Sequence, residues 1–310
     1  MTATVSRLGQ ANAAGDVNAL FLKLFGGEVF TAFETNTVFK DKHFSRQISN
    51  GRSASFPSVG TVAVQNHTPG ARIAESTVPL AEKVITVEGK IIASASVADI
   101  DEAMNHFDVR EPISTEIGRQ LAYHYDRNIA RSMILAARAT NPLTGRAGGG
   151  RITNANIGTD AALLEAAMFT AMQTLDEKDV PSDGRFYFLR PAQFYLLAQR
   201  DRLMNRDYGG NGNISQGTLE TVAGVTLVKT NNLPTADDTA NALVPVSIRA
   251  NYTANRGIIA HKMAAGSVQL MTLAMEMERE IRNQSYFMVG SYAVGHDWLR
   301  PECAVEVATA

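Results

Sequence analysis

The longest regular pattern of hydrophobic positions runs from about Pro112 to Ala139. Apolar or aromatic residues recur there every four positions and lie along one slowly drifting stripe of a helix, at Ile117, Leu121, Tyr125, Ile129 and Met133. Proline is favoured in a first helical turn, where its missing N–H costs nothing. At ~1.5 Å per residue the helix would be about 40 Å long, and the pattern therefore predicts a spine.

Three further helices are expected. One runs from about Asp160, a good N-cap residue, to Lys178, with Leu164, Met168, Met172 and Leu175 facing inward. Another is opened by Pro191 and runs to about residue 200. A short amphipathic helix with Leu20, Phe21, Leu24 and Phe25 on one face is expected to stop at Gly26-Gly27.

Residues 45–98 carry a strand pattern instead. Two β-branched stretches, Arg46–Val64 and Thr77–Ala98, flank the polar turn sequence at residues 65–70. The pattern predicts a long two-stranded ribbon. Such a ribbon is marginally stable alone in water, so it needs a second surface on which to lie.

Other strands are predicted at 185–189, 222–229, 257–261, 267–270 and 286–294, with a charged segment at 276–282 between the last two. Polar, glycine-rich loops are expected at 145–150 and 201–217. The chain therefore reads as mixed α+β, without repeats or the regular alternation of a doubly wound sheet.

Composition narrows the function. The 310 residues are 45% hydrophobic and 19% charged, with a formal net charge of −2 and a pI of about 6.3. A dedicated nucleic-acid binder usually carries a strong basic excess, which this chain lacks. A single cysteine, Cys303, excludes an intramolecular disulfide and a cysteine-based zinc cluster. The apolar stretch at 19–33 is too short and too interrupted for a membrane span or signal peptide, so we expect synthesis in the cytosol and no membrane partner.

The residues expected to do chemistry do not form a catalytic pattern. The six histidines show no metal-ligand spacing, and a structural role is expected for each. The glycine runs at 145–150 and 209–212 are not followed by Lys-Ser/Thr, as a phosphate loop would require. The acidic run at 99–102 lacks the glycine and distal glutamate of a calcium loop. We therefore expect no enzyme activity and no cofactor.

One charge pattern leaves two interpretations open. Arg127, Arg131 and Arg138 fall within ~40° of each other around the long helix, opposite its apolar stripe. They could be a solvated face with ordinary ion pairs. Alternatively, they form a cationic strip that faces DNA or an acidic partner protein.

Several segments together resemble the major capsid proteins of T-seven-like podoviruses, which belong to the HK-ninety-seven fold family of tailed-phage shells. The most specific segments are EKVITVEG at 82–89 and DIDEAMNHFDVR at 99–110. Further similar segments occur, in the same order as in the family, at 19–33, 53–57, 261–268 and 292–302. The resemblance covers the chain from about residue 18 to its end.

The resemblance implies an α+β capsid fold with named parts. Residues 1–44 would be the N-terminal arm and segment, and residues 45–98 the E-loop, which lies over a neighbouring subunit. Residues 99–182 would be the peripheral domain with the spine helix at 112–139. Residues 183–257 would be the axial domain, and residues 258–310 the C-terminal strands returning to the peripheral domain.

The implied function is that of a structural major capsid protein in the virion, assembled in the host bacterial cytoplasm. It would form pentamers and hexamers of an icosahedral shell around double-stranded DNA, contacted without sequence specificity. The expected partners are further copies of itself, a separate scaffolding protein and a portal protein, and a decoration protein is left open. Because Lys83 and Lys90 lie on the returning strand of the E-loop, no covalent crosslinking is expected. The alternatives are an encapsulin-like nanocompartment shell and an unrecognised hydrolase or transferase.

Overall fold

The computed structural model describes residues 19–98 except 63, 71, 74 and 76, then residue 100, residues 110–143, 145–200, residue 203 and residues 219–310. It is a mixed α+β fold, as predicted, with helices α1 (Ala19–Asn36), α3 (Arg110–Arg138), α4 (Ala161–Glu177) and α5 (Pro191–Ala198). The long helix α3 confirms the predicted spine, and Asp160 caps α4 by accepting hydrogen bonds from two backbone N–H groups. The expected N-terminal arm at 1–18, the run at 99–102 and the loop at 201–217 lie largely outside the described residues.

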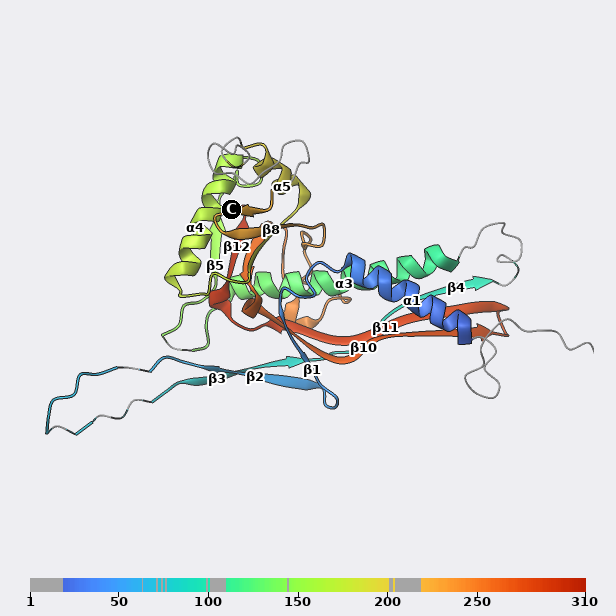
Figure 1. The fold of residues 1–310 in the computed structure, drawn as a ribbon, viewed down its shortest axis with the longest axis horizontal. Helices are drawn as coiled ribbons and strands as arrows, with labels where there is room; N and C mark the ends of the chain where they lie inside the picture. The colour runs from blue at the N-terminus through green and yellow to red at the C-terminus, as the bar shows by residue number, and fades with distance from the viewer. Residues whose placement is uncertain are drawn as a thin grey trace, which may run out of the picture. The chain divides into compact units, whose positions relative to one another are not determined.

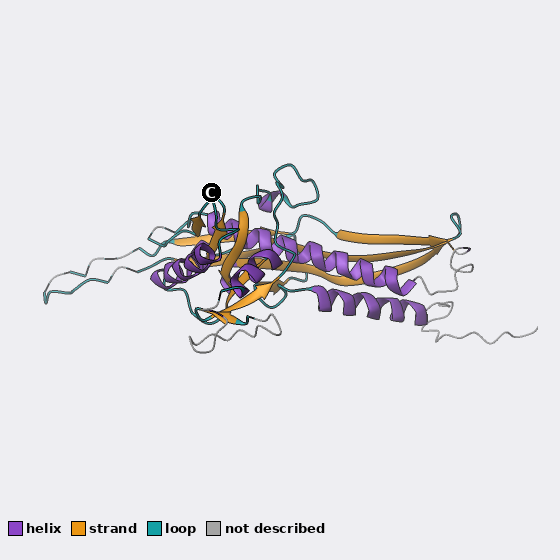
Figure 2. Ribbon diagram, turned by 90° about the horizontal axis from the view of Figure 1, so that it is seen from above, coloured by secondary structure: helices purple, strands orange, loops and turns teal. Residues whose placement is uncertain are grey.

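The strands form three sheets (Figures 1 and 2). The four-stranded sheet has the order β1 (Phe44–Gln47), β10 (Ala265–Glu280), β11 (Ser285–Trp298) and β4 (Ile91–Ala98). The six-stranded sheet has the order β5 (Gly150–Thr153), β12 (Ala304–Ala308), β9 (Asn255–His261), β6 (Arg185–Leu189), β8 (Val225–Lys229) and β7 (Thr221–Val222). The third sheet pairs only β2 (Ser53–Val59) with β3 (Leu80–Thr86).

The described chain divides into two compact units, and the first contains residues 19–37, 89–125 and 271–294. Its core is a cluster of buried side chains from α1, α3 and β11: Val29, Ile117, Leu121, Met288, Tyr292 and Val294. Helices α1 and α3 approach closely at Gly118, where a Cβ atom would lie 2.6 Å from the carbonyl oxygen of Val29. Only glycine permits that approach.

Helix α1 corrects a prediction, because it continues through Gly26-Gly27 to Asn36. Two glycines cost a helix about 2 kcal/mol together. Burial of Val29 in the core, together with the close contact at Gly118, stabilises the helix beyond them.

Strand β10 also differs from the sequence prediction, because it runs through most of the charged segment expected at 276–282. Leu273, Met275 and Met277 pack against the core of the first unit, whereas Glu276 and Glu278 are exposed. Alternation of this kind is typical of a strand with one buried face. The charges therefore mark the solvent face of a strand and not a break in it.

The second unit contains residues 38–88, 126–270 and 295–310, and it includes the whole six-stranded sheet. Strand β12 pairs antiparallel with β9 and parallel with β5, and β6 pairs antiparallel with β9 and parallel with β8. The strand interiors are fully buried, among them Tyr187, Phe188, Ile258, Ile259, Val305 and Val307. Strand β12 therefore lies in the same sheet as β6 and β8, while the assignment of residues 258–310 to the peripheral domain stays a prediction.

The strand predicted at 222–229 is a hairpin. Strands β7 and β8 pair antiparallel around Ala223 and Gly224, whose φ angles are 51° and 78°. Positive φ at both central residues gives the turn that matches the twist of paired strands. The sequence pattern did not predict this turn, because alanine rarely adopts a positive φ angle.

Candidate assembly surface

The β2–β3 ribbon is shorter than the predicted excursion. Residues 44–47 pair with β10 and residues 91–98 pair with β11, so only the stretch between them leaves these strands. Strands β2 and β3 pair from Ser53↔Thr86 to Val59↔Leu80, and a loop of residues 60–79 extends beyond them (Figure 1). The structure therefore confirms the ribbon and narrows it to residues 53–86.

The far end of the ribbon and its loop expose large apolar side chains. Leu80 is 75% exposed, Ile73 is 72% exposed and Val64 is 96% exposed. Val59, opposite Leu80, and Val62 are also exposed. Exposed apolar side chains gathered on one projecting element mark a surface that a partner covers.

At its root, where β3 meets Asp297 and Trp298 of β11, the ribbon is held by an ion pair and by contact with an aromatic ring. The Nζ atom of Lys83 on β3 lies 2.8 Å from Oδ2 of Asp297 and 3.8 Å from the centroid of the Trp298 ring. Burial raises the pKa of Asp297, and the hydrogen bond from Lys83 opposes that shift. Gly295 permits the approach of β11, because a Cβ there would lie 2.4 Å from the carbonyl oxygen of Thr86.

The first strand of the second unit supplies another aromatic contact. The rings of Phe44 and Phe56 pack edge to face with centroids 5.8 Å apart, and the Arg46 guanidinium lies 5.9 Å from the Phe56 centroid. The Nη1 atom of Arg46 also donates a hydrogen bond to the carbonyl oxygen of Ser55, at 3.1 Å. These contacts fix β1 against β2.

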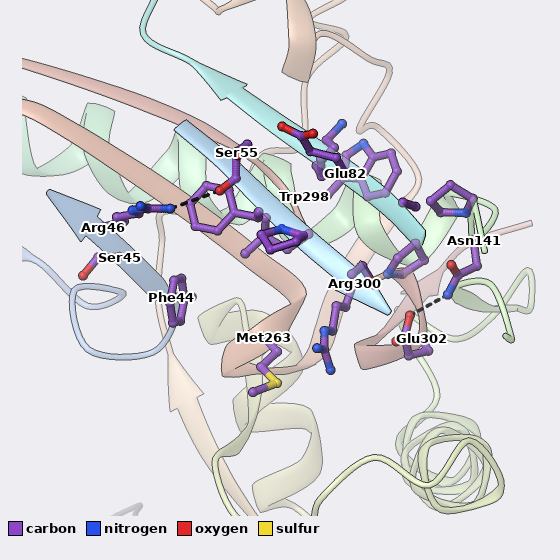
Figure 3. A pocket seen from close by; sticks show the side chains of 18 residues that line it. Phe44, Ser45, Arg46, Ser55, Glu82, Asn141, Met263, Trp298, Arg300 and Glu302 are labelled. Carbon is purple, nitrogen blue, oxygen red and sulfur yellow. Dashed lines mark hydrogen bonds between the residues drawn. The ribbon is translucent and has the colours of Figure 1, made fainter. Parts of the chain in front are cut away.

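A pocket of about 570 Å³ lies at this root, within the second unit. Apolar lining comes from Phe44, Phe56, Pro142, Met263 and Trp298, and charged lining comes from Arg46, Glu82, Lys83, Arg300 and Glu302. Figure 3 shows these side chains gathered around the root of the ribbon, with Asn141 donating a hydrogen bond to Glu302 at 2.8 Å. Such a mixture of apolar surface and a few charges suits a side chain and its charged neighbour from another polypeptide.

The three arginines predicted to form one strip occupy different surroundings. Arg131 is 7% exposed and donates to Oδ2 of Asp238 from Nε at 2.9 Å and from Nη2 at 2.7 Å. Arg138 donates to both carboxylate oxygens of Glu306. Arg127 is exposed.

The expectation of one continuous cationic strip is therefore wrong. Helical spacing placed Arg131 correctly on the face opposite the stripe, but that face meets a loop that carries Asp238. A solvent-facing strip requires that no other element covers the helix there. A contact of Arg127 with DNA or with a scaffold stays a prediction.

Asp126 joins three segments of the second unit. Its carboxylate accepts hydrogen bonds from the backbone N–H groups of Val38 at 2.8 Å and Phe39 at 3.3 Å, and from Nδ2 of Asn232 at 2.8 Å. Burial raises its pKa to about 6, although these three donors act in the opposite direction. Its role is structural: it holds the chain after α1 and the loop after β8 against α3.

Other groups with chemical potential are also tied into the fold. His43 is buried between the carbonyl oxygen of Phe39 and the Ser267 hydroxyl, at 2.8 and 2.7 Å. Cys303 is buried, and burial raises the pKa of its thiol to about 12. Within the part of the chain that the structure describes, no three His, Cys, Asp or Glu side chains are grouped so that they could hold a metal ion. Across the same residues, no helix is long and apolar enough to cross a membrane.

Sequence reasoning missed the root pocket. Its walls come from six separate stretches of chain, and no spacing in the sequence links β1 with η4 (Pro301–Cys303). The one available signal was the chain's only tryptophan, Trp298, which lies between Asp297 and Arg300 in the segment 292–302. Tryptophan beside charged residues is typical of interfaces.

Comparison with known proteins gives consistent results. The family described as Gp10A-like, major capsid protein, matches residues 55–308. The major capsid protein of Escherichia phage T7 is 30% identical over 319 aligned residues, which cover 94% of this chain and 92% of that protein. The capsid structure of the cyanophage P-SCSP1u is 39% identical, with a TM-score of 0.82, covering 100% of this chain and 99% of that one.

A more distant likeness shows the fold alone. A virus-like particle from Pyrococcus furiosus has a TM-score of 0.58 at 10% identity, covering 93% of this chain and 99% of that one. The fold therefore does not separate phage shells from other protein shells. The sequence matches do separate them, and they favour a phage capsid over the encapsulin-like alternative.

Proposed function

The chain belongs to the Gp10A-like family of major capsid proteins, and from that premise we propose how its surfaces are used in the shell. It is a subunit of the icosahedral capsid of a tailed phage, with the HK-ninety-seven-like fold, and a component of the virion. Because it assembles into shells, it associates with copies of itself.

The proposed E-loop is the ribbon centred on residues 53–86, within the stretch 45–98, and it lies over a neighbouring subunit. The observation that carries this proposal is the exposure of Leu80, Ile73 and Val64 on an element that is too thin to bury them itself. In a ring, each ribbon covers the next subunit, so the same apolar surface is buried once per subunit.

The proposed domains follow the same scheme. Residues 99–182 form the peripheral domain, residues 183–257 form the axial domain around the five- and six-fold axes, and residues 1–44 form the N-terminal arm and segment. The C-terminal stretch 258–310 returns to the peripheral domain through β10 and β11, while β12 stays in the sheet of the axial strands. Pentamers and hexamers built from these parts enclose double-stranded DNA.

The proposed partners are a separate scaffolding protein, a portal protein and DNA contacted without sequence specificity, with Arg127 as the candidate contact on α3. The protein is proposed to catalyse nothing. Its buried acid Asp126 and its buried thiol Cys303 serve the fold, and neither lines the root pocket. The Lys83 amine already pairs with Asp297, which supports the absence of covalent crosslinks between subunits.

Co-expression with a candidate scaffolding protein tests the proposal. Negative-stain electron microscopy should show closed shells of uniform diameter, and a denaturing gel of those shells should show the capsid chain as a single band at 33.4 kDa. A monodisperse small oligomer under every condition would reject shell formation. A ladder of covalent oligomers would reject the absence of crosslinks and leave shell formation standing.

A further inference from the structure

We propose that the root pocket of each subunit receives the tip of the E-loop of a second copy, with Ile73 entering the pocket and Glu75 pairing with Arg300. This inference rests on the proposed E-loop contact and names the receiving site and the residues that enter it.

The tip of the E-loop, around Ile73 and Glu75, has an apolar side chain that its own chain does not bury. Ile73 is 72% exposed, and Glu75, two residues later, is also exposed. Only one residue separates them along the chain, so the tip presents an apolar group and a carboxylate close together.

The pocket has the complementary pair. Its apolar lining of Phe44, Met263 and Trp298 suits a branched aliphatic side chain, and Met263 is 41% exposed before anything binds. Of its two acidic lining residues, Glu302 is engaged, because it accepts a hydrogen bond from Asn141 and lies 3.5 Å from Arg146, whereas Glu82 is exposed. Arg300 is then the cation suited to an incoming carboxylate.

The occupant must come from another copy. The ribbon and its loop extend away from the root (Figure 1), and at ~3.3 Å per residue the ten residues from Ile73 to Lys83 allow a separation of up to roughly 30 Å. The same tip reaches a neighbour's pocket in a head-to-tail ring, where each subunit gives one tip and receives one.

Disulfide trapping tests the contact. Ile73→Cys is combined with Met263→Cys, or with Ser58→Cys on the β2 side of the pocket, in the full chain. Shells are assembled, oxidised and run on a non-reducing denaturing gel. At least one pair should give a ladder of covalent oligomers that ends at five or six subunits, because a disulfide needs Cα atoms about 4–7 Å apart. The native Cys303 is buried and stays out of the reaction.

Controls make the outcome specific. The single variants, and Ile73→Cys paired with Glu177→Cys on the exposed side of α4, should give no ladder. Shells that form normally but show no ladder with either pocket position overturn the inference and leave the proposed function intact. A ladder obtained with Leu8→Cys in place of Ile73→Cys assigns the pocket to the N-terminal segment and overturns the inference as well. Failure of the unmodified chain to form shells would instead reject the proposed function.

A charge exchange gives a second readout. Glu75→Arg and Arg300→Glu should each lower the yield of closed shells about tenfold, the effect of one lost charge-assisted hydrogen bond. The double variant should restore the yield, because the pair is rebuilt in reverse. Equal yields for both single variants and the unmodified chain would contradict the proposed pairing of Glu75 with Arg300.

Discussion

The buried carboxylate of Glu306 accepts two hydrogen bonds from the guanidinium of Arg138, one from Nε at 2.7 Å and one from Nη2 at 2.6 Å. Arg151 approaches the same carboxylate, with Nε 3.2 Å from Oε2. Arg138 closes α3, Arg151 lies on β5 and Glu306 lies on β12, so one fully buried acid joins three elements of the second unit.

Glu306→Gln should therefore destabilise the subunit strongly. The substitution leaves the Arg138 guanidinium, which is partly removed from water, facing a fully buried neutral amide, at a cost of about 3 kcal/mol. Urea unfolding of the unassembled subunit measures the change. The control is Glu116→Gln on α3, which breaks the exposed pair with Arg119 and should leave the midpoint unchanged. Equal midpoints for both variants would show that the buried pair contributes no more to stability than the exposed pair.

Arg131→Gln and Arg127→Gln should behave differently, although both lie on the face predicted to be cationic. Removing Arg131 leaves the Asp238 carboxylate, whose side chain is 6% exposed, without its partner, and the free energy of unfolding should fall by about 3 kcal/mol. Arg127→Gln should leave stability unchanged.

Only Arg127→Gln then reports on contact with DNA or a scaffold. Normal shell yield with reduced DNA content would support a DNA contact, and reduced shell yield would support a scaffold contact. Normal values for both would reject Arg127 as a contact. A triple variant that includes Arg131 would lose packaging for structural reasons alone.

Asp126 should make stability depend on pH. Burial holds its pKa at about 6 in the folded subunit, above the ordinary value of 3.8. Between these values the folded chain binds more protons than the unfolded chain, so the contribution of Asp126 is full below about pH 3.8 and is lost as the pH rises through about 6. The loss is on the order of 3 kcal/mol.

Asp126→Asn should remove this dependence, because asparagine does not titrate. In urea unfolding, the free energy of unfolding of the unmodified chain relative to that of the variant should be lower at pH 7 than at pH 4.5. The other acid whose pKa is raised by burial, Asp297, titrates in both proteins and cancels in the comparison. Parallel curves for the two proteins would contradict the assignment.

Ala223→Asn should stabilise the hairpin of β7 and β8. Alanine at φ 51° is strained, whereas asparagine followed by glycine is the preferred pair for this turn. A gain of about 0.5–1 kcal/mol is expected in the free energy of unfolding. Ala242→Asn, at an exposed loop position without positive φ, is the matched control and should change nothing. A gain in both variants would point to a cause other than the turn.

Elements with local signals could be predicted from the residues alone. The four-residue repeat from Ile117 to Met133 specified the spine helix, and Asp160 specified the start of α4. The two β-branched stretches around the turn at 65–70 specified the ribbon. Collinear segments from about residue 18 to the end placed the chain in its family before any contact between them was known.

Tertiary structure decided which side chains meet. Helical spacing put Arg131 and Arg138 on the predicted face, but the elements that cover them, carrying Asp238 and Glu306, come from more than 100 residues further along the chain. Packing likewise carried α1 through Gly26-Gly27 and joined Lys83 to Asp297 beside Trp298. Burial and pairing depend on which distant segments the fold brings together, whereas a spacing within one segment reports only on that segment's own geometry.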